Sequence, residues 1–163
     1  MRASGPILAA THGMYQSQAH AHRGFPPIDR TSELAAELLD VVNASELQAF
    51  LGRLVAETAG RIGTRSSDEL LGALQQIAER TVPTLTTALG SAPPASVAAR
   101  RASRVFGVEL EGVSAEDRDY EIARQFVRFA RAAAAGSAAA PVGRAVAEAG
   151  REFAPGLLGS HPL

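Results

Sequence analysis

The sequence predicts an all-α protein: a compact bundle of about five to six helices behind an extended N-terminal arm. Three observations predict this class. Apolar residues recur at spacings of three and four from residue 31 onward, and glycine and proline separate the repeats. A polar residue is followed three positions later by an acidic one, the spacing of a capping box, at three points in the chain. We therefore expect an arm over residues 1–30, a helical domain over 31–158 and a C-terminal tail over 159–163.

The arm shows no sustained hydrophobic period, and the apolar stretch after Met1 is too short for a secretory signal peptide. His12, His20 and His22 could offer imidazoles to a metal ion, yet no carboxylate or cysteine lies near enough in sequence to complete a rigid site. We expect no metal there, and we interpret the segment as a flexible arm or one that docks on a partner.

Capping residues predict where the first two helices of the domain begin. Thr31 or Ser32 could cap a short helix. Asn43 and Glu46 have capping-box spacing and begin a second helix, which Gly60 ends. The apolar faces of these two helices hold Leu34, Leu38, Val41, Leu47, Phe50, Leu51, Leu54 and Val55.

The middle of the domain contains two further helices and a turn. Ser66 and Glu69 repeat the box and begin a helix that ends before Pro83, after which we expect a short turn around Leu85. The pair Pro93–Pro94 is typical of a helix start and predicts the next helix.

The last part of the domain contains the clearest helix. Residues 108–111 alternate like a strand but have no partner run, and we interpret them as a connector. Ser114 and Asp117 begin a long helix, and Pro141 begins a final one that ends before Pro155. The apolar arc of the long helix, which we assign to the core, holds Ile122, Phe126, Phe129 and Ala133.

The composition excludes several classes of function. The 163 residues contain no cysteine and no lysine, since all 16 basic residues are arginine. Thiolate metal sites, thiol nucleophiles, P-loop lysines and Schiff-base lysines are therefore ruled out. A net charge of -1 argues against a general nucleic-acid binder, and no apolar run approaches the roughly 20 residues of a membrane helix. We expect no cofactor, no nucleic acid and no stable membrane span.

Two helices carry small residues opposite their large apolar face. Small residues four apart allow another helix to approach closely. Three interpretations stay open: chance in an alanine-rich chain, tight packing within the chain, or a seam between subunits. With an aromatic residue on the long helix, the candidate interface residues are Gly52, Ala56, Tyr120, Gly143 and Ala147.

Charged residues gather in three places. Arg124, Arg128 and Arg131 form a basic ridge on the long helix and are candidate contacts for an anion or a partner; the alternative is a solvated face paired with Glu121. A second ridge holds Arg100, Arg101 and Arg104. The third group complements the start of the long helix better than it suits an active site, and consists of Glu116, Asp117, Asp119 and Glu121.

Five short blocks carry a resemblance to a known group. They are residues 33–39 (ELAAELL), 45–54 (SELQAFLGRL), 110–118 (LEGVSAEDR), 120–130 (YEIARQFVRFA) and 153–158 (FAPGLL). In these blocks the chain resembles a group of uncharacterised bacterial proteins, loosely associated with loci of extracellular contractile injection systems. Members of that group carry a glycine zipper where residues 61–104 are ordinary amphipathic sequence here. The resemblance implies an accessory of a secreted assembly, and it brings no catalytic residues.

We expect a non-enzymatic structural protein that forms a homo-oligomer or docks on a larger bacterial particle, since no catalytic motif is present. The alternative is a cargo or toxin-like effector, membrane-active on release, of a contractile injection apparatus. A small enzyme would require Asp117 or Glu121 in a deep pocket. We expect the chain in the cytoplasm at synthesis, with export or loading into a particle left open.

Overall fold

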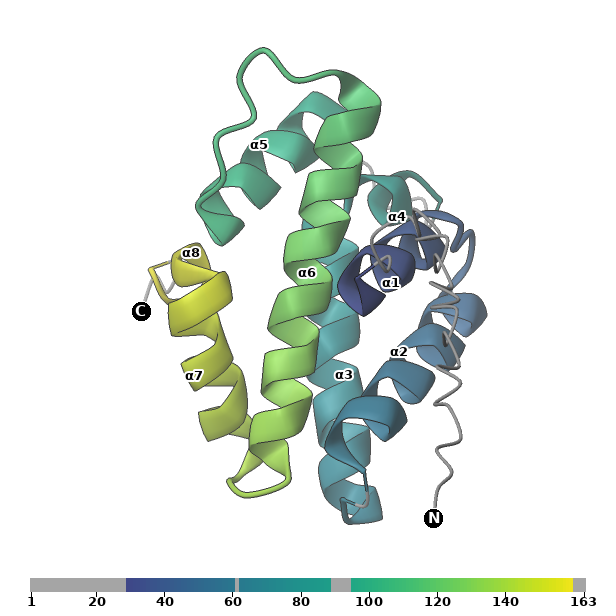
Figure 1. The fold of residues 1–163 in the computed structure, drawn as a ribbon, viewed down its shortest axis with the longest axis vertical. Coiled ribbons are helices and arrows are strands. Elements are labelled where there is room, and N and C mark those ends of the chain that lie inside the picture. Colours follow the sequence, from purple (N-terminus) through teal and green to yellow (C-terminus); the bar gives the residue numbers. More distant parts are fainter. Residues whose placement is uncertain (1–28, 61, 89–94, 160–163) are drawn as a thin grey trace, which may run out of the picture.

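The computed structural model describes residues 29–60, 62–88 and 95–159, and within these ranges it contains eight helices and no strand. Six helices have ten or more residues and two are short, which confirms the all-α prediction. The helices are α1 Arg30–Leu39, α2 Ala44–Ala59, α3 Thr64–Thr81, α4 Pro83–Ala88, α5 Ala95–Phe106, α6 Ala115–Ser137, α7 Val142–Phe153 and α8 Pro155–Leu158 (Figure 1).

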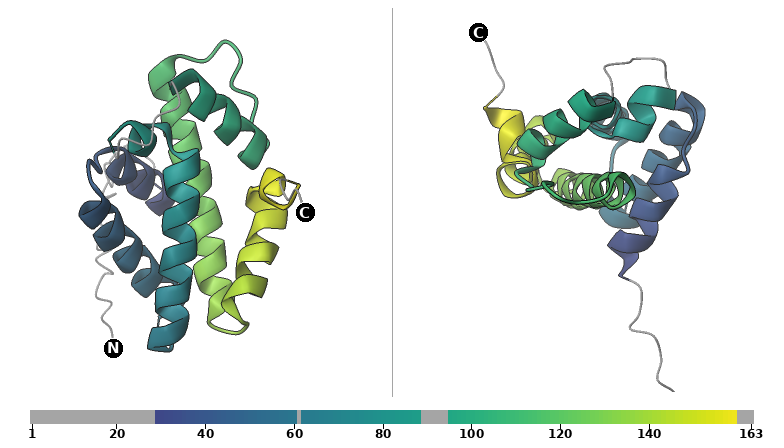
Figure 2. Two further views of the ribbon diagram at one scale, coloured as in Figure 1. Left: turned by 180° about the vertical axis from the view of Figure 1, so that it is seen from behind. Right: turned by 90° about the horizontal axis from the view of Figure 1, so that it is seen from above.

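The longest helix, α6, is the centre of the bundle. It packs against α1, α2, α3, α5 and α7, and the two views of Figure 2 agree that α7 and α2 lie on opposite sides of it. The short connection over residues 138–141 turns the chain back, so that α7 returns along α6. Each surrounding helix therefore needs only one apolar stripe, the pattern that the sequence shows.

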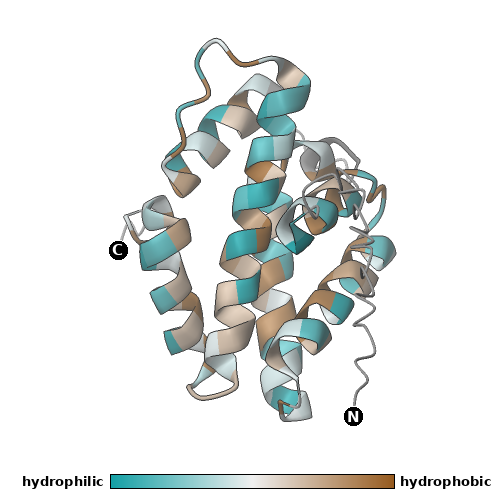
Figure 3. Ribbon diagram, in the orientation of Figure 1, coloured by the Kyte–Doolittle hydropathy of each residue, from teal (hydrophilic) through white to brown (hydrophobic). Residues whose placement is uncertain are grey.

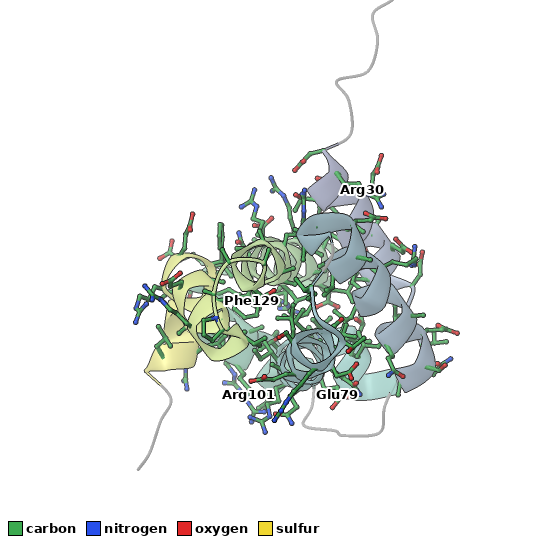
Figure 4. All side chains as sticks on the ribbon, turned by 90° about the horizontal axis from the view of Figure 1, so that it is seen from below. Arg30, Glu79, Arg101 and Phe129 are labelled. Carbon is green, nitrogen blue, oxygen red and sulfur yellow. The ribbon has the colours of Figure 1, made fainter. Side chains whose placement is uncertain are left out.

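The hydrophobic core runs along α6. Phe126 and Phe129 are both 0% exposed, and their rings lie 6.4 Å apart at a tilt of 50°, which confirms the core assignment. Figure 3 shows apolar and polar segments alternating along α2 and α6, and Figure 4 shows Phe129 among the interior side chains. The other large side chains that are fully buried include Leu38, Leu47, Phe50, Leu51, Leu54, Leu70, Leu74, Leu85 and Ile122.

Two of the predicted capping boxes are confirmed. The Asn43 side-chain oxygen accepts a hydrogen bond of 2.9 Å from the Glu46 backbone N–H, and the Glu46 carboxylate accepts one of 3.0 Å from the Val42 N–H. The Ser114 hydroxyl accepts the Asp117 N–H at 3.1 Å. Gly60 ends α2 with a φ of 63°, a conformation that glycine adopts without steric cost.

Other predicted boundaries were wrong. Helix α1 begins at Arg30 behind Asp29, so neither Thr31 nor Ser32 caps it, and Thr31 is buried instead. Helix α3 begins at Thr64 behind Gly63 with no side-chain cap, two residues before the predicted box. Its first turn is exposed, so water can satisfy the free N–H groups and no cap is needed.

Proline starts two short helices that the sequence did not predict as helices. The turn around Leu85 is α4, which begins at Pro83. Pro155 ends α7 as predicted but also begins α8. Proline is tolerated at both positions because the backbone N–H that it lacks would have no hydrogen-bond acceptor within the helix at its first residue.

Most of the predicted arm lies outside the described residues, which include only Asp29 and Arg30 of it; of the tail, only Gly159 is described. His12, His20, His22 and His161 also lie outside. In the described part of the chain, no helix combines the length and the apolar character needed to cross a membrane.

Candidate functional site

A groove of about 830 Å³ lies where the C-terminal half of α3 meets α5 and α8. Figure 2 shows these helices from behind, with α5 next to α3 and α8 next to α5. Its lining combines arginines with apolar side chains: Ile77, Arg80, Thr81, Val97, Arg100, Arg101, Arg104, Val105 and Leu157. Its volume is within the range of about 300–1,000 Å³ that ligand sites occupy.

Helix α5 places three arginines along the groove. Its buried face, which includes Ala98, Ala102 and Val105, turns Arg100, Arg101 and Arg104 outward, and residues three and four apart on a helix are neighbours. Arg80 comes from the last turn of α3. Figure 4 shows Arg101 at the rim of the molecule beside α3.

Gly156 allows α8 to approach closely enough to complete the groove. A Cβ atom at this position would lie 2.8 Å from Val105 Cα and closer still to the Arg104 carbonyl oxygen. Real Cβ atoms do not approach backbone so closely, so only glycine fits here. This contact holds Leu157 at the groove.

The four arginines of the groove have no ion-pair partner in the described part of the chain. All 17 acidic residues of the sequence lie in that part, so the remaining segments hold no acidic side chain that could reach in. The acidic side chain beside them on α3 is Glu79 (Figure 4), whose carboxylate accepts a hydrogen bond of 2.9 Å from Gln75. Within the described residues, no ion pair therefore neutralises the positive charge of the groove.

The groove is suited to binding and not to acid–base catalysis. Guanidinium groups stay protonated at all working pH values, donate up to five hydrogen bonds and pair with carboxylates in a two-pronged geometry. They cannot accept a proton from a substrate. Between them, Ile77, Val97 and Leu157 are half-buried and offer apolar contact area.

No family model, curated protein or solved structure matches this chain. The function is therefore inferred from the geometry of the groove, and the resemblance of the five sequence blocks stays an expectation.

Two of the three arginines of the ridge predicted on α6 make contacts within the chain. Arg124 pairs with Glu121 at 3.3 Å, and Arg131 donates a 3.0 Å hydrogen bond to the Thr31 hydroxyl. Arg128 is half-buried and makes no ion pair with a described residue. The second ridge, on α5, by contrast holds three arginines that make no ion pair with a described residue.

The small-residue stripes do not meet each other. Gly52 and Ala147 are half-buried, Ala56 and Gly143 are exposed, and the helices that carry them lie on opposite sides of α6 (Figure 1). A Cβ atom at Gly52 or Gly143 would meet nothing within 4 Å, so tight packing within the described chain is wrong for these two glycines. The seam between subunits stays a prediction, as does the interface role of the fifth candidate, Tyr120, which is half-buried against the core.

The acidic cluster belongs to the start of α6. Asp117 is exposed and hydrogen-bonded to Ser114, and Glu121 accepts hydrogen bonds from Arg124 and Gln125. Burial raises the pKa of the Asp119 carboxyl above its ordinary value of 3.8, against a smaller opposing effect of Arg118. Neither Asp117 nor Glu121 is withdrawn from solvent, the condition set above for an enzyme.

A second hollow, of about 590 Å³, lies between α5 and the connector over residues 108–111. It shares Arg100 with the first groove and combines it and Arg118 with Glu109 and Glu111, so this hollow, unlike the first, has acidic side chains in its lining. In the described ranges no three histidine or acidic side chains are grouped to hold a metal ion. The first groove is therefore the stronger candidate.

Proposed function

We propose that this chain is a non-enzymatic binding protein that docks, through the arginine-lined groove, on an acidic segment of a protein partner. One observation carries the proposal: four arginines line a partly apolar groove and have no ion-pair partner in the described part of the chain. An acidic side chain of a partner would gain charge-assisted hydrogen bonds there, and an apolar one would cover the floor.

The shape of the site favours a protein segment over a bilayer. The four arginines of the lining are exposed, whereas Ile77, Val97 and Leu157 are half-buried, so a segment that enters the groove can contact both kinds of side chain. A flat anionic surface would reach the exposed arginines alone. This proposal agrees with the expected role in an assembly and gives that role a location.

Fluorescence anisotropy with a labelled helical peptide of glutamate and leucine tests the proposal. We expect the full chain to bind the peptide, and the double substitution Arg100→Glu with Arg101→Glu to weaken binding about tenfold or more. Binding should also weaken between about 0.15 M and 1 M salt, because the Debye length falls from about 8 to about 3 Å.

Arg65→Glu is the matched control. This arginine is exposed in the first turn of α3, about 22 Å along the same helix from Arg80, and its substitution should leave binding unchanged. Equal binding by the groove variant would overturn the proposal. So would wild-type protein that ignores the peptide but binds and permeabilises phosphatidylglycerol vesicles, the result that the effector alternative predicts.

A further inference from the structure

The connection between α1 and α2 forms an exposed acidic corner, which comprises Asp40, Val42 and Glu46; the neighbouring Glu37 is half-buried and already paired with Arg53. Val42 is 61% exposed, the highest value among the large apolar residues in the described part of the chain. It lies between Asp40 and Glu46, both of them exposed. The corner thus presents one apolar side chain flanked by carboxylates, the complement of an apolar floor rimmed by arginines.

The two flanking carboxylates differ in how the fold uses them. Glu46 is held in place, because its oxygens accept hydrogen bonds from Asn43 at 2.8 Å and from the Val42 N–H at 3.0 Å. Asp40 forms no ion pair with a described residue and lies at the C-terminus of α1, where the helix dipole disfavours a negative charge. Among the described residues, Asp40 therefore has no ion pair to lose when it meets an arginine of another molecule.

Charge is separated along the chain in a way that matches these two surfaces. Residues 29–60 contain six acidic residues and two arginines, whereas residues 80–108 contain four arginines and no acidic residue. The α1–α2 corner and the α5–α8 side lie at opposite edges of the molecule (Figure 1). The corner cannot enter the groove of its own copy, but it can face the groove of another.

We propose that the groove takes the acidic corner of a second copy of this chain, so that copies associate head to tail. Asp40 and Glu46 then meet the arginines of α5, and Val42 covers the apolar floor at Ile77 and Leu157. The contact is heterologous, because it joins two different surfaces, so repeated copies build either a closed ring or an open filament. This inference rests on the proposed function and names the partner.

Two complementary variants test the proposal by light scattering on the full chain. The groove variant carries Arg100→Glu and Arg101→Glu and keeps the corner; the corner variant carries Asp40→Arg and keeps the groove. We expect the wild-type mass to rise above 16.9 kDa with concentration, and each variant to stay at the monomer mass. An equimolar mixture of the variants should form a dimer and stop there, because one intact corner meets one intact groove.

Control variants separate this contact from general charge effects. Arg65→Glu makes the chain more negative, as the groove variant does, and Glu69→Arg makes it more positive, as the corner variant does. Both positions are exposed on α3 outside the two surfaces, and both variants should assemble like wild type. Far-ultraviolet circular dichroism verifies that each variant is folded. If a charge reversal lowers helicity, Arg101→Gln and Asp40→Asn replace it, with about a tenfold weaker association expected of each.

Monomeric wild-type protein throughout the concentration series would overturn the inference. Assembly of the wild type without dimer formation in the mixture would overturn the head-to-tail geometry. Either result leaves the proposed function standing if the wild-type groove still binds the acidic peptide. Loss of peptide binding as well would overturn both.

Discussion

The guanidinium of Arg131 donates a 3.0 Å hydrogen bond from Nη1 to the Thr31 hydroxyl, and so joins α6 to the first turn of α1 across 100 residues of sequence. Thr31 is only 6% exposed, so its hydroxyl has little access to water. Arg131 therefore satisfies a buried polar group, and part of the predicted basic ridge contributes to the fold.

Substitution of Arg131 by methionine should lower the free energy of unfolding by about 1 kcal/mol, because it leaves the buried Thr31 hydroxyl without its donor. Urea unfolding followed by circular dichroism measures the change. Arg128→Met is the control, since that arginine makes no ion pair with a described residue, and its effect should stay within about 0.5 kcal/mol. Equal losses in the two variants would contradict the interpretation of Arg131.

Gly156→Ala should lower the free energy of unfolding by about 1–3 kcal/mol, because the added methyl meets the backbone of α5 and forces α8 away. The displacement also moves Leu157, so peptide binding in the groove should weaken. Gly159→Ala is the control, since a Cβ atom there meets nothing within 4 Å. A Gly156→Ala variant with wild-type stability would show that the approach of α8 is not fixed.

Gly143→Leu distinguishes the groove from the small-residue stripes as the site of assembly. The position is exposed and open, so helicity should be retained. If the head-to-tail contact forms the assembly, the variant should have the same solution mass as wild type. If a seam along α7 forms it, the variant should fall to the monomer mass. Light scattering and circular dichroism on the same sample decide between them, and a folded protein that no longer assembles would favour the seam.

Stability at neutral pH should rise when Asp119 is replaced by asparagine. Burial raises the folded-state pKa of this carboxyl above 3.8, so its ionisation opposes folding as the pH rises through the folded-state value. The gain should therefore be present at pH 7 and absent below about pH 3, where the carboxyl is protonated in both states. Urea midpoints at both pH values measure it.

Glu116→Gln provides the comparison for Asp119. It removes an exposed carboxylate from the first turn of α6, where a negative charge interacts favourably with the helix dipole. We expect no gain in stability at pH 7. A larger gain from Glu116→Gln than from Asp119→Asn would contradict the role assigned to burial.

Local chemistry made much of the fold predictable. The boxes at Asn43 and Ser114 lie within single turns, so their residues suffice to place α2 and α6. Ser66 has the same spacing, yet α3 starts earlier, because an exposed helix end needs no side-chain cap. The short helices begun by Pro83 and Pro155 depend on tertiary packing: α4 packs on its sequence neighbours α3 and α5, and α8 packs on α7 and on the distant α5.

The groove was only partly predictable. The ridge of Arg100, Arg101 and Arg104 follows from helical spacing, but its partners Arg80 and Leu157 come from α3 and α8, and tertiary packing brings them together. One signal in the sequence could have pointed to it: the absence of acidic residues between positions 80 and 108. The small-residue stripes on α2 and α7 remain a prediction, because only a second molecule could form the seam that they suggest.

The central position of α6 also determines when this protein can fold during synthesis. Helix α1 packs chiefly on α6, although about 75 residues separate the end of one from the start of the other. On the ribosome, at about 5–20 residues per second, the apolar faces of α1 and α2 remain uncovered for about 5–20 s until residue 137 has been added. The part of these faces that α6 covers therefore stays exposed throughout that interval, and completion of a single helix buries it.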